Sequence, residues 1–144
     1  MAIFDVLFES SDDQVVTNAS AVSTNIIDMQ LADLNMGAGE PIWLNIRIGT
    51  AFAGGTSLVF GLYSHSAVEV GSGTLLWATP AITDATMVAG YWIMRMPLPD
   101  DVDRERYIGL YYTTSGTHSA GTINAWLDHG PQSNTNTQVT ASNI

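Results

Sequence analysis

Apolar residues recur at every second position along four segments of the chain, 42–48, 57–63, 107–113 and 122–128. A period of two is typical of a β-strand with one buried face. A helix would need apolar residues at spacings of three and four, which these segments lack. Each segment is therefore predicted to be a strand whose inward face carries Ile42, Leu44, Ile46 and Ile48, then Leu58, Phe60 and Leu62, then Ile108, Leu110 and Tyr112, and finally Ile123, Ala125 and Leu127.

Less regular alternation predicts further strands at 3–8, 13–17, 25–29, 74–78 and 91–96. Turn-forming residues such as Gly54-Gly55 and Ser115-Gly116 separate the strand segments. Only 28–36 and 81–89 can hold a helical turn. Short strands separated by regular turns favour an all-β fold, a jelly-roll-like antiparallel β-sandwich of about eight strands.

The composition changes near the C-terminus. Residues 129–144 (HGPQSNTNTQVTASNI) contain no Asp, Glu, Lys or Arg and few apolar residues. Such a segment cannot bury enough apolar surface to order itself. We therefore predict a jelly-roll domain at 1–128 and an extended C-terminal arm at 129–144 that a neighbouring chain holds.

The charge balance argues against two classes of partner. The 144 residues include 14 acids but only four bases, all of them arginine, so the formal net charge is −10. Nucleic-acid binding relies on clustered Lys and Arg, and anionic lipid surfaces also attract basic segments. The uncharged stretch 48–68 is long enough to span a bilayer, but Gly54-Gly55 and recurring Ser and Thr favour two strands and a turn. We expect no nucleic-acid or membrane partner.

No residue set points to catalysis or to a bound cofactor. The chain has no cysteine, and therefore neither a disulfide framework nor a cysteine-based zinc site. His65, His118 and His129 have turn-like surroundings without metal-ligand spacing, so we expect loop residues without a role. The charged segment 100–106 suits a solvated turn with local ion pairs better than a calcium loop. The sequence predicts no enzyme activity, no metal and no cofactor.

Several aromatic residues lie on the strand faces opposite the aliphatic ones. Two functional hypotheses follow, because Trp and Tyr are enriched in protein interfaces and also form stacking platforms for sugars. A third interpretation is that both strand faces are simply covered. The interface hypothesis assigns the contact to Trp43, Tyr63, Tyr107, Tyr111 and Trp126, together with the arm residues Pro131, Gln132, Asn134, Asn136, Val139 and Ile144. The sugar hypothesis uses Trp43, Trp92 or Trp126.

Three stretches resemble the small jelly-roll cement (decoration) proteins of tailed-phage capsids, the family typified by the Bordetella phage cement protein. They are FESSDDQVVTNASAVSTNIIDM (8–29), GEPIWLNIRIGTAFAGG (39–55) and RERYIGLYYTTSGTHSAGTINAWL (104–127). Each stretch contains residue types that are common in strands and turns. The resemblance rests on the order of the three stretches and on their joint presence in one chain. The long neutral tail after Trp126 departs from the family pattern.

The resemblance implies a structural role in the virion. A cement protein of this type binds the outside of the major capsid shell, bridges neighbouring capsomers and stabilises the DNA-filled head. The implied partners are the major capsid protein and further copies of the chain, as a homodimer or alternatively a trimer. The alternative function is a carbohydrate-binding jelly-roll module on the virion surface.

Overall fold

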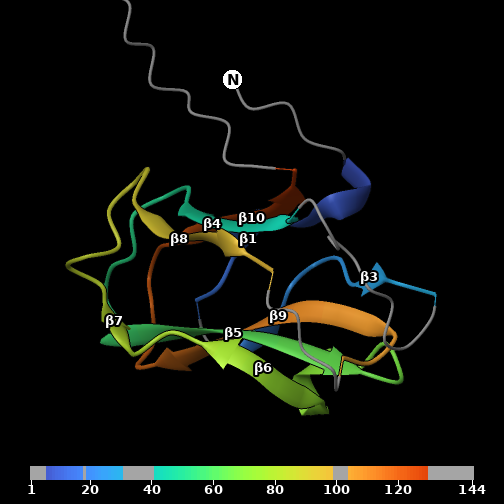
Figure 1. Cartoon of the computed structure of the whole chain (residues 1–144). Coiled ribbons are helices and arrows are strands. Elements are labelled where there is room, and N and C mark those ends of the chain that lie inside the picture. The colour runs from blue at the N-terminus through green and yellow to red at the C-terminus, as the bar shows by residue number, and fades with distance from the viewer. Residues whose placement is uncertain (1–5, 18, 31–40, 99–103, 130–144) are drawn as a thin grey trace, which may run out of the picture.

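A computed structural model describes residues 6–17, 19–30, 41–98 and 104–129, and these form two antiparallel sheets packed as a sandwich (Figure 1). Sheet A has the order β1 (Glu9–Val15), β10 (Thr122–Asp128), β4 (Trp43–Ile48) and β8 (Trp92–Pro97). Sheet B has the order β2 (Ala21–Val22), β9 (Tyr107–Ser115), β5 (Ser57–His65) and β6 (Thr74–Ala78), with β3 (Ile27–Asp28) also on β9 and β7 (Ile82–Thr83) also on β5. Two short 3₁₀ turns are η1 (Val6–Phe8) and η2 (Val70–Ser72).

The strand order is that of a jelly roll. Because β2 and β3 both pair with β9, and β6 and β7 both pair with β5, the ten strands fill eight positions. Numbered along the chain, these positions have the order 1-8-3-6 in sheet A and 2-7-4-5 in sheet B. This arrangement contains the two Greek keys of a jelly roll. The predicted all-β jelly-roll sandwich of about eight strands is confirmed. Of the predicted arm at 129–144, residues 130–144 lie outside the described part of the chain.

The core lies between the aliphatic faces of the two sheets. Every residue predicted to face inward is buried except Ile42, which is partly buried and packs against the core. The phenol of Tyr112 is fully buried, and its oxygen lies 2.7 Å from Ser11 Oγ across the sandwich. Burial raises the pKa of this phenol well above its ordinary value. The period-two interpretation of the four main segments is therefore correct.

The weaker strand predictions need corrections. Residues 6–8 of the predicted strand 3–8 form η1, and the first strand runs over Glu9–Val15 instead of 13–17. Alternation is absent from β1 because its pairing with β10 shifts register twice and Asp13 has a φ of 42°. The buried residues of β1 are also polar, namely Glu9, Ser10 and Ser11. Segment 81–89 contains the short strand β7 followed by a turn.

Candidate interaction surfaces

The outer face of sheet A carries a cluster of two tryptophans and two arginines, Trp92, Trp126, Arg47 and Arg95, which we call the Trp–Arg cluster. The rings of Trp92 and Trp126 meet edge to face, with centroids 5.7 Å apart. The guanidinium carbons of Arg95 and Arg47 lie 4.3 Å and 5.5 Å from the centroid of Trp92. Both distances are within the range of a cation–π contact. Half of the chain's four bases thus gather around one ring.

An irregularity in strand pairing creates this cluster. In the β4–β8 ladder, Ile46 pairs with Met94 while Arg47 pairs with Trp92, so β8 has one extra residue at Ile93. A one-residue shift moves all following side chains to the other face of the sheet. Trp92 and Arg95, three residues apart, therefore share the outer face. Simple alternation along 91–96 would have separated them.

The tryptophans differ in how much ring surface they present. Trp126 is only 6% exposed, and its Nε1–H donates a hydrogen bond of 3.1 Å to Asp128 Oδ2. Trp43 is half-buried and faces Asp128 in the neighbouring ladder position. Since Arg95 lies over Trp92, a sugar would have to displace that arginine or use Trp43. This geometry leaves little room for the stacking platform that the sugar hypothesis assigns to the tryptophans.

The outer face of sheet B carries the other predicted interface aromatics. Tyr63 and Tyr111 meet edge to face with centroids 5.8 Å apart, and Tyr107 lies beneath the guanidinium of Arg106 at 5.0 Å. The five aromatics of the interface prediction therefore form two groups on opposite sides of the sandwich, not one platform. The six arm residues of that prediction (Pro131, Gln132, Asn134, Asn136, Val139 and Ile144) lie outside the described residues.

Arg106 forms an ion pair that links distant parts of the chain. Its Nε and Nη2 donate to Asp28 Oδ1 and Oδ2 at 2.8 and 2.7 Å. The hydrogen bonds from Arg106 and from the Gln30 backbone lower the pKa of Asp28 to about 2, and Asp28 raises that of Arg106. The expectation of purely local pairing within 100–106 is wrong for Arg106, whose partner lies 78 residues away, on β3. Residues 100–103 lie outside the described part of the chain.

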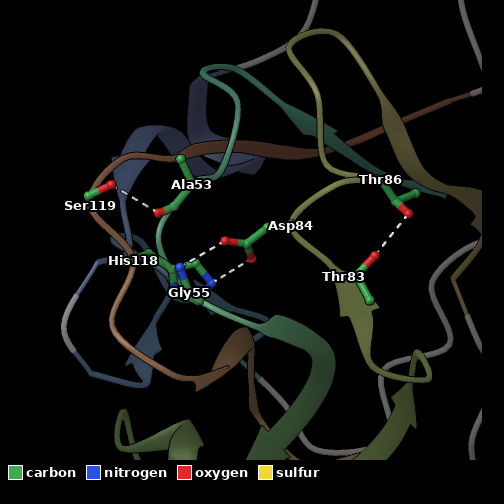
Figure 2. A network of polar contacts seen from close by, with 7 residues as sticks. All are labelled: Ala53, Gly55, Thr83, Asp84, Thr86, His118 and Ser119. Carbon is green, nitrogen blue, oxygen red and sulfur yellow. Dashed lines mark hydrogen bonds and ion pairs between the residues drawn. The ribbon is translucent and has the colours of Figure 1, made fainter.

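His118 is also not the roleless loop residue that the sequence predicted. It is 1% exposed, and its Nε2 lies 2.9 Å from Asp84 Oδ1, while Asp84 Oδ2 accepts a 2.9 Å hydrogen bond from the backbone N–H of Gly55 (Figure 2). Next to it, the backbone N–H of Ser119 donates to Ala53 O at 2.7 Å. These contacts join the β4–β5, β7–β8 and β9–β10 loops at one end of the sandwich. No sequence spacing reveals the pair, because its members are 34 residues apart.

The other titratable side chains of the described residues do not form a cluster. Among residues 6–17, 19–30, 41–98 and 104–129, no three His, Cys, Asp or Glu side chains lie together as a metal site would require. The same ranges contain no helix long and apolar enough to cross a membrane. Burial, and to a smaller degree the nearby Asp12, raise the pKa of Glu9, which pairs with Trp126 at the edge of sheet A. The outer faces of the two sheets therefore present aromatic, arginine and hydroxyl groups, which are suited to non-covalent contacts.

The family model Bbp16 matches residues 10–127, from the second residue of β1 to the penultimate residue of β10. The match thus spans the whole sandwich. Among curated proteins, none matched the chain. The protein belongs to the Bbp16 family, a family of phage proteins.

Proposed function

We propose that the protein is a capsid cement (decoration) protein that binds the outside of the major capsid shell and stabilises the DNA-filled head. The observation that carries this proposal is the family match, which covers residues 10–127 and hence both sheets. A phage family with an all-β sandwich fits a structural part of the virion. The proposed role needs no catalysis and no cofactor.

The distribution of aromatic residues supports a bridging role. A protein that joins two neighbouring capsomers needs contact groups on more than one side. Trp43 and Trp92 lie on the outer face of sheet A, while Tyr63 and Tyr111 lie on the outer face of sheet B. Aromatic side chains supply much of the energy at protein interfaces. Repetition over a capsid lattice makes weak single contacts strong in sum.

The direct test uses capsids that lack the protein. Purified protein, which we expect to be a homodimer, is added to expanded capsids assembled from the major capsid protein alone. The proposal expects saturable binding to the outer surface, seen by electron cryomicroscopy, and a higher temperature of capsid disruption. Capsids that neither bind the protein nor gain thermal stability would contradict it.

A truncation tests the contribution of the predicted arm. Removal of residues 129–144 leaves β1 to β10 complete, so the sandwich should fold as before. If the arm anchors the protein, the truncated chain should bind capsids more weakly while its circular dichroism spectrum stays unchanged. Undiminished binding would assign the anchoring to the faces of the sandwich alone.

A further inference from the structure

A polar pocket of about 230 Å³ lies where β5 ends and β6 begins, on the rim of sheet B away from the Trp–Arg cluster. His65 and Glu105, which carry an imidazole and a carboxylate, are among the residues that line it. The other lining residues are Ser64, Ser66, Ser72, Gly73 and Thr74, four of which carry hydroxyl groups. Neither the interface hypothesis nor the proposed capsid role uses these residues.

The pocket is built by a close approach of two backbone segments. A Cβ added at Gly73 would lie 2.1 Å from Ser64 O and 2.9 Å from His65 Cβ, so no larger residue fits there without a backbone shift. Ser64 is fully buried, and its Oγ accepts a 3.2 Å hydrogen bond from the backbone N–H of Glu105. This contact holds Glu105, two residues before β9, against the end of β5.

The hydrogen-bonding roles of several lining groups are already set. The backbone N–H of Ala67 donates to His65 Nδ1 at 2.8 Å, so the neutral ring carries its proton on Nε2 and offers a donor. Ser72 Oγ donates to Glu69 O at 3.0 Å and keeps its lone pairs as acceptors. The Glu105 carboxylate accepts only. The lining residues therefore combine one ring donor, one carboxylate, a Ser72 hydroxyl that accepts, and the hydroxyls of Ser66 and Thr74, which can both donate and accept.

This chemistry selects against charged ligands. An anion would meet the Glu105 carboxylate in a chain of net charge −10, and the nearby Arg106 is already paired with Asp28. A metal ion would find one carboxylate and one imidazole, too few for a site among the described residues. An uncharged molecule with adjacent hydroxyl groups satisfies a carboxylate, an imidazole N–H and hydroxyls together.

We propose that the pocket at His65, Glu105 and Thr74 binds a single sugar unit of a glycan. The volume of about 230 Å³ is below that of sites for drug-sized ligands and suits one pyranose ring. Tyr107 pairs directly with His65 across the β9–β5 ladder and gives the site an aromatic neighbour. This inference is independent of the capsid role and differs from a stacking platform on the tryptophans of sheet A.

The test is a titration of the full chain with the methyl α-pyranosides of glucose, galactose, mannose and rhamnose, followed by ¹H–¹⁵N NMR. At least one sugar should shift the amides of His65, Ala67, Thr74 and Glu105 saturably, with a Kd of about 1 mM for a ligand of about a dozen heavy atoms. Glu105→Gln should weaken this binding about tenfold, because it removes a charged hydrogen-bond acceptor. Glu69→Gln, which makes the same charge change outside the pocket lining, should leave the affinity unchanged.

Each other outcome overturns the proposal. No shift with any of the four sugars excludes the site, and shifts centred on Trp43 or Trp92 move the sugar to sheet A. Shifts of the pocket amides with calcium chloride but with no sugar would make it a cation site. Should Glu105→Gln fail to fold, the isosteric Thr74→Val at an exposed strand position serves instead, and unchanged affinity in that variant counts against the pocket. Capsid binding, measured separately, is unaffected by any of these results.

Discussion

His118 Nε2 and Asp84 Oδ1 lie 2.9 Å apart, at the point where three loops meet at one end of the jelly roll. The His118 side chain is fully buried, and its Nδ1 has no hydrogen-bond partner among the described residues, so the ring's hydrogen bonding there is the contact with Asp84. The backbone N–H of His118 also donates to Thr17 O at 2.8 Å, which brings in the segment after β1. Because buried polar groups are costly when unpaired, this pair determines how well the loop end holds together.

Asp84→Ala should destabilise the protein by about 2–4 kcal/mol, because it leaves His118 Nε2 and the Gly55 N–H without their acceptor. The measurement is the free energy of unfolding in urea. Thr86→Ala on the same loop is the matched control, since it removes only the exposed 3.2 Å contact with Thr83 and should cost less than about 0.5 kcal/mol. Equal effects of the two substitutions would show that the His118–Asp84 contact does not hold the loops.

Gly55→Ala tests the packing of the same ring. A Cβ at this position would lie 2.3 Å from His118 Nε2, so the imidazole must move, at a cost of about 1–3 kcal/mol. In the double variant Gly55→Ala/His118→Ala the clash is gone, and the methyl group should cost little. A double-mutant cycle should therefore give a coupling of at least about 1 kcal/mol. Additive effects would contradict the close contact.

The sequence predicted the sheets well because their main strands are governed by burial. Ile46, Phe60, Leu110 and Ile123 each belong to a series of apolar residues at every second position, and all four are buried in the core. The edge strand β1 was misplaced because its buried residues are polar and its register shifts. The sequence does not predict the short strand β7, because two residues are too few to show an alternation of apolar and polar positions.

The surface features could not be predicted in the same way. The Trp–Arg cluster depends on the extra residue at Ile93, and the His118–Asp84 and Arg106–Asp28 pairs join residues 34 and 78 positions apart. Local periodicity contains no information about such contacts. The alternation along each strand predicts that the aromatic residues lie on the outer faces. Their division between two sheets follows only from the jelly-roll topology.

Asp28 should titrate with an unusually low midpoint. Hydrogen bonds from Arg106 and from the Gln30 N–H lower its pKa from 3.8 to about 2. A lowered folded-state pKa stabilises the protein above the unfolded value, and this contribution is lost as the pH falls through about 2. The ¹³C carboxyl resonance of Asp28 reports the midpoint directly. In Arg106→Gln the midpoint should return toward 3.8, and a wild-type midpoint near 3.8 would contradict the ion pair.

Tyr112 should resist ionisation until the protein unfolds. Burial raises the pKa of its phenol, so the folded state keeps the proton while the unfolded chain releases it near pH 10. Stability is therefore fully present below about pH 10 and decreases as the pH rises further. Ultraviolet titration should show that Tyr112 ionises only with unfolding. Tyr112→Phe should remove this alkaline loss, at a cost of about 1 kcal/mol for the lost contact with Ser11.

Arg95 should contribute more to stability than Arg47, although both contact Trp92. The Arg95 guanidinium lies 4.3 Å from the ring centroid and that of Arg47 lies 5.5 Å away, so Arg95 makes the closer cation–π contact. Arg95→Ala is expected to cost about 1 kcal/mol in urea unfolding and Arg47→Ala about 0.5 kcal/mol. Arg95→Lys should recover only part of the loss, because a lysine cannot stack a planar guanidinium on the indole. In the Trp92→Ala background Arg95→Ala should cost less than in the wild-type protein, and an unchanged cost there would show that the contact with Trp92 does not stabilise the fold.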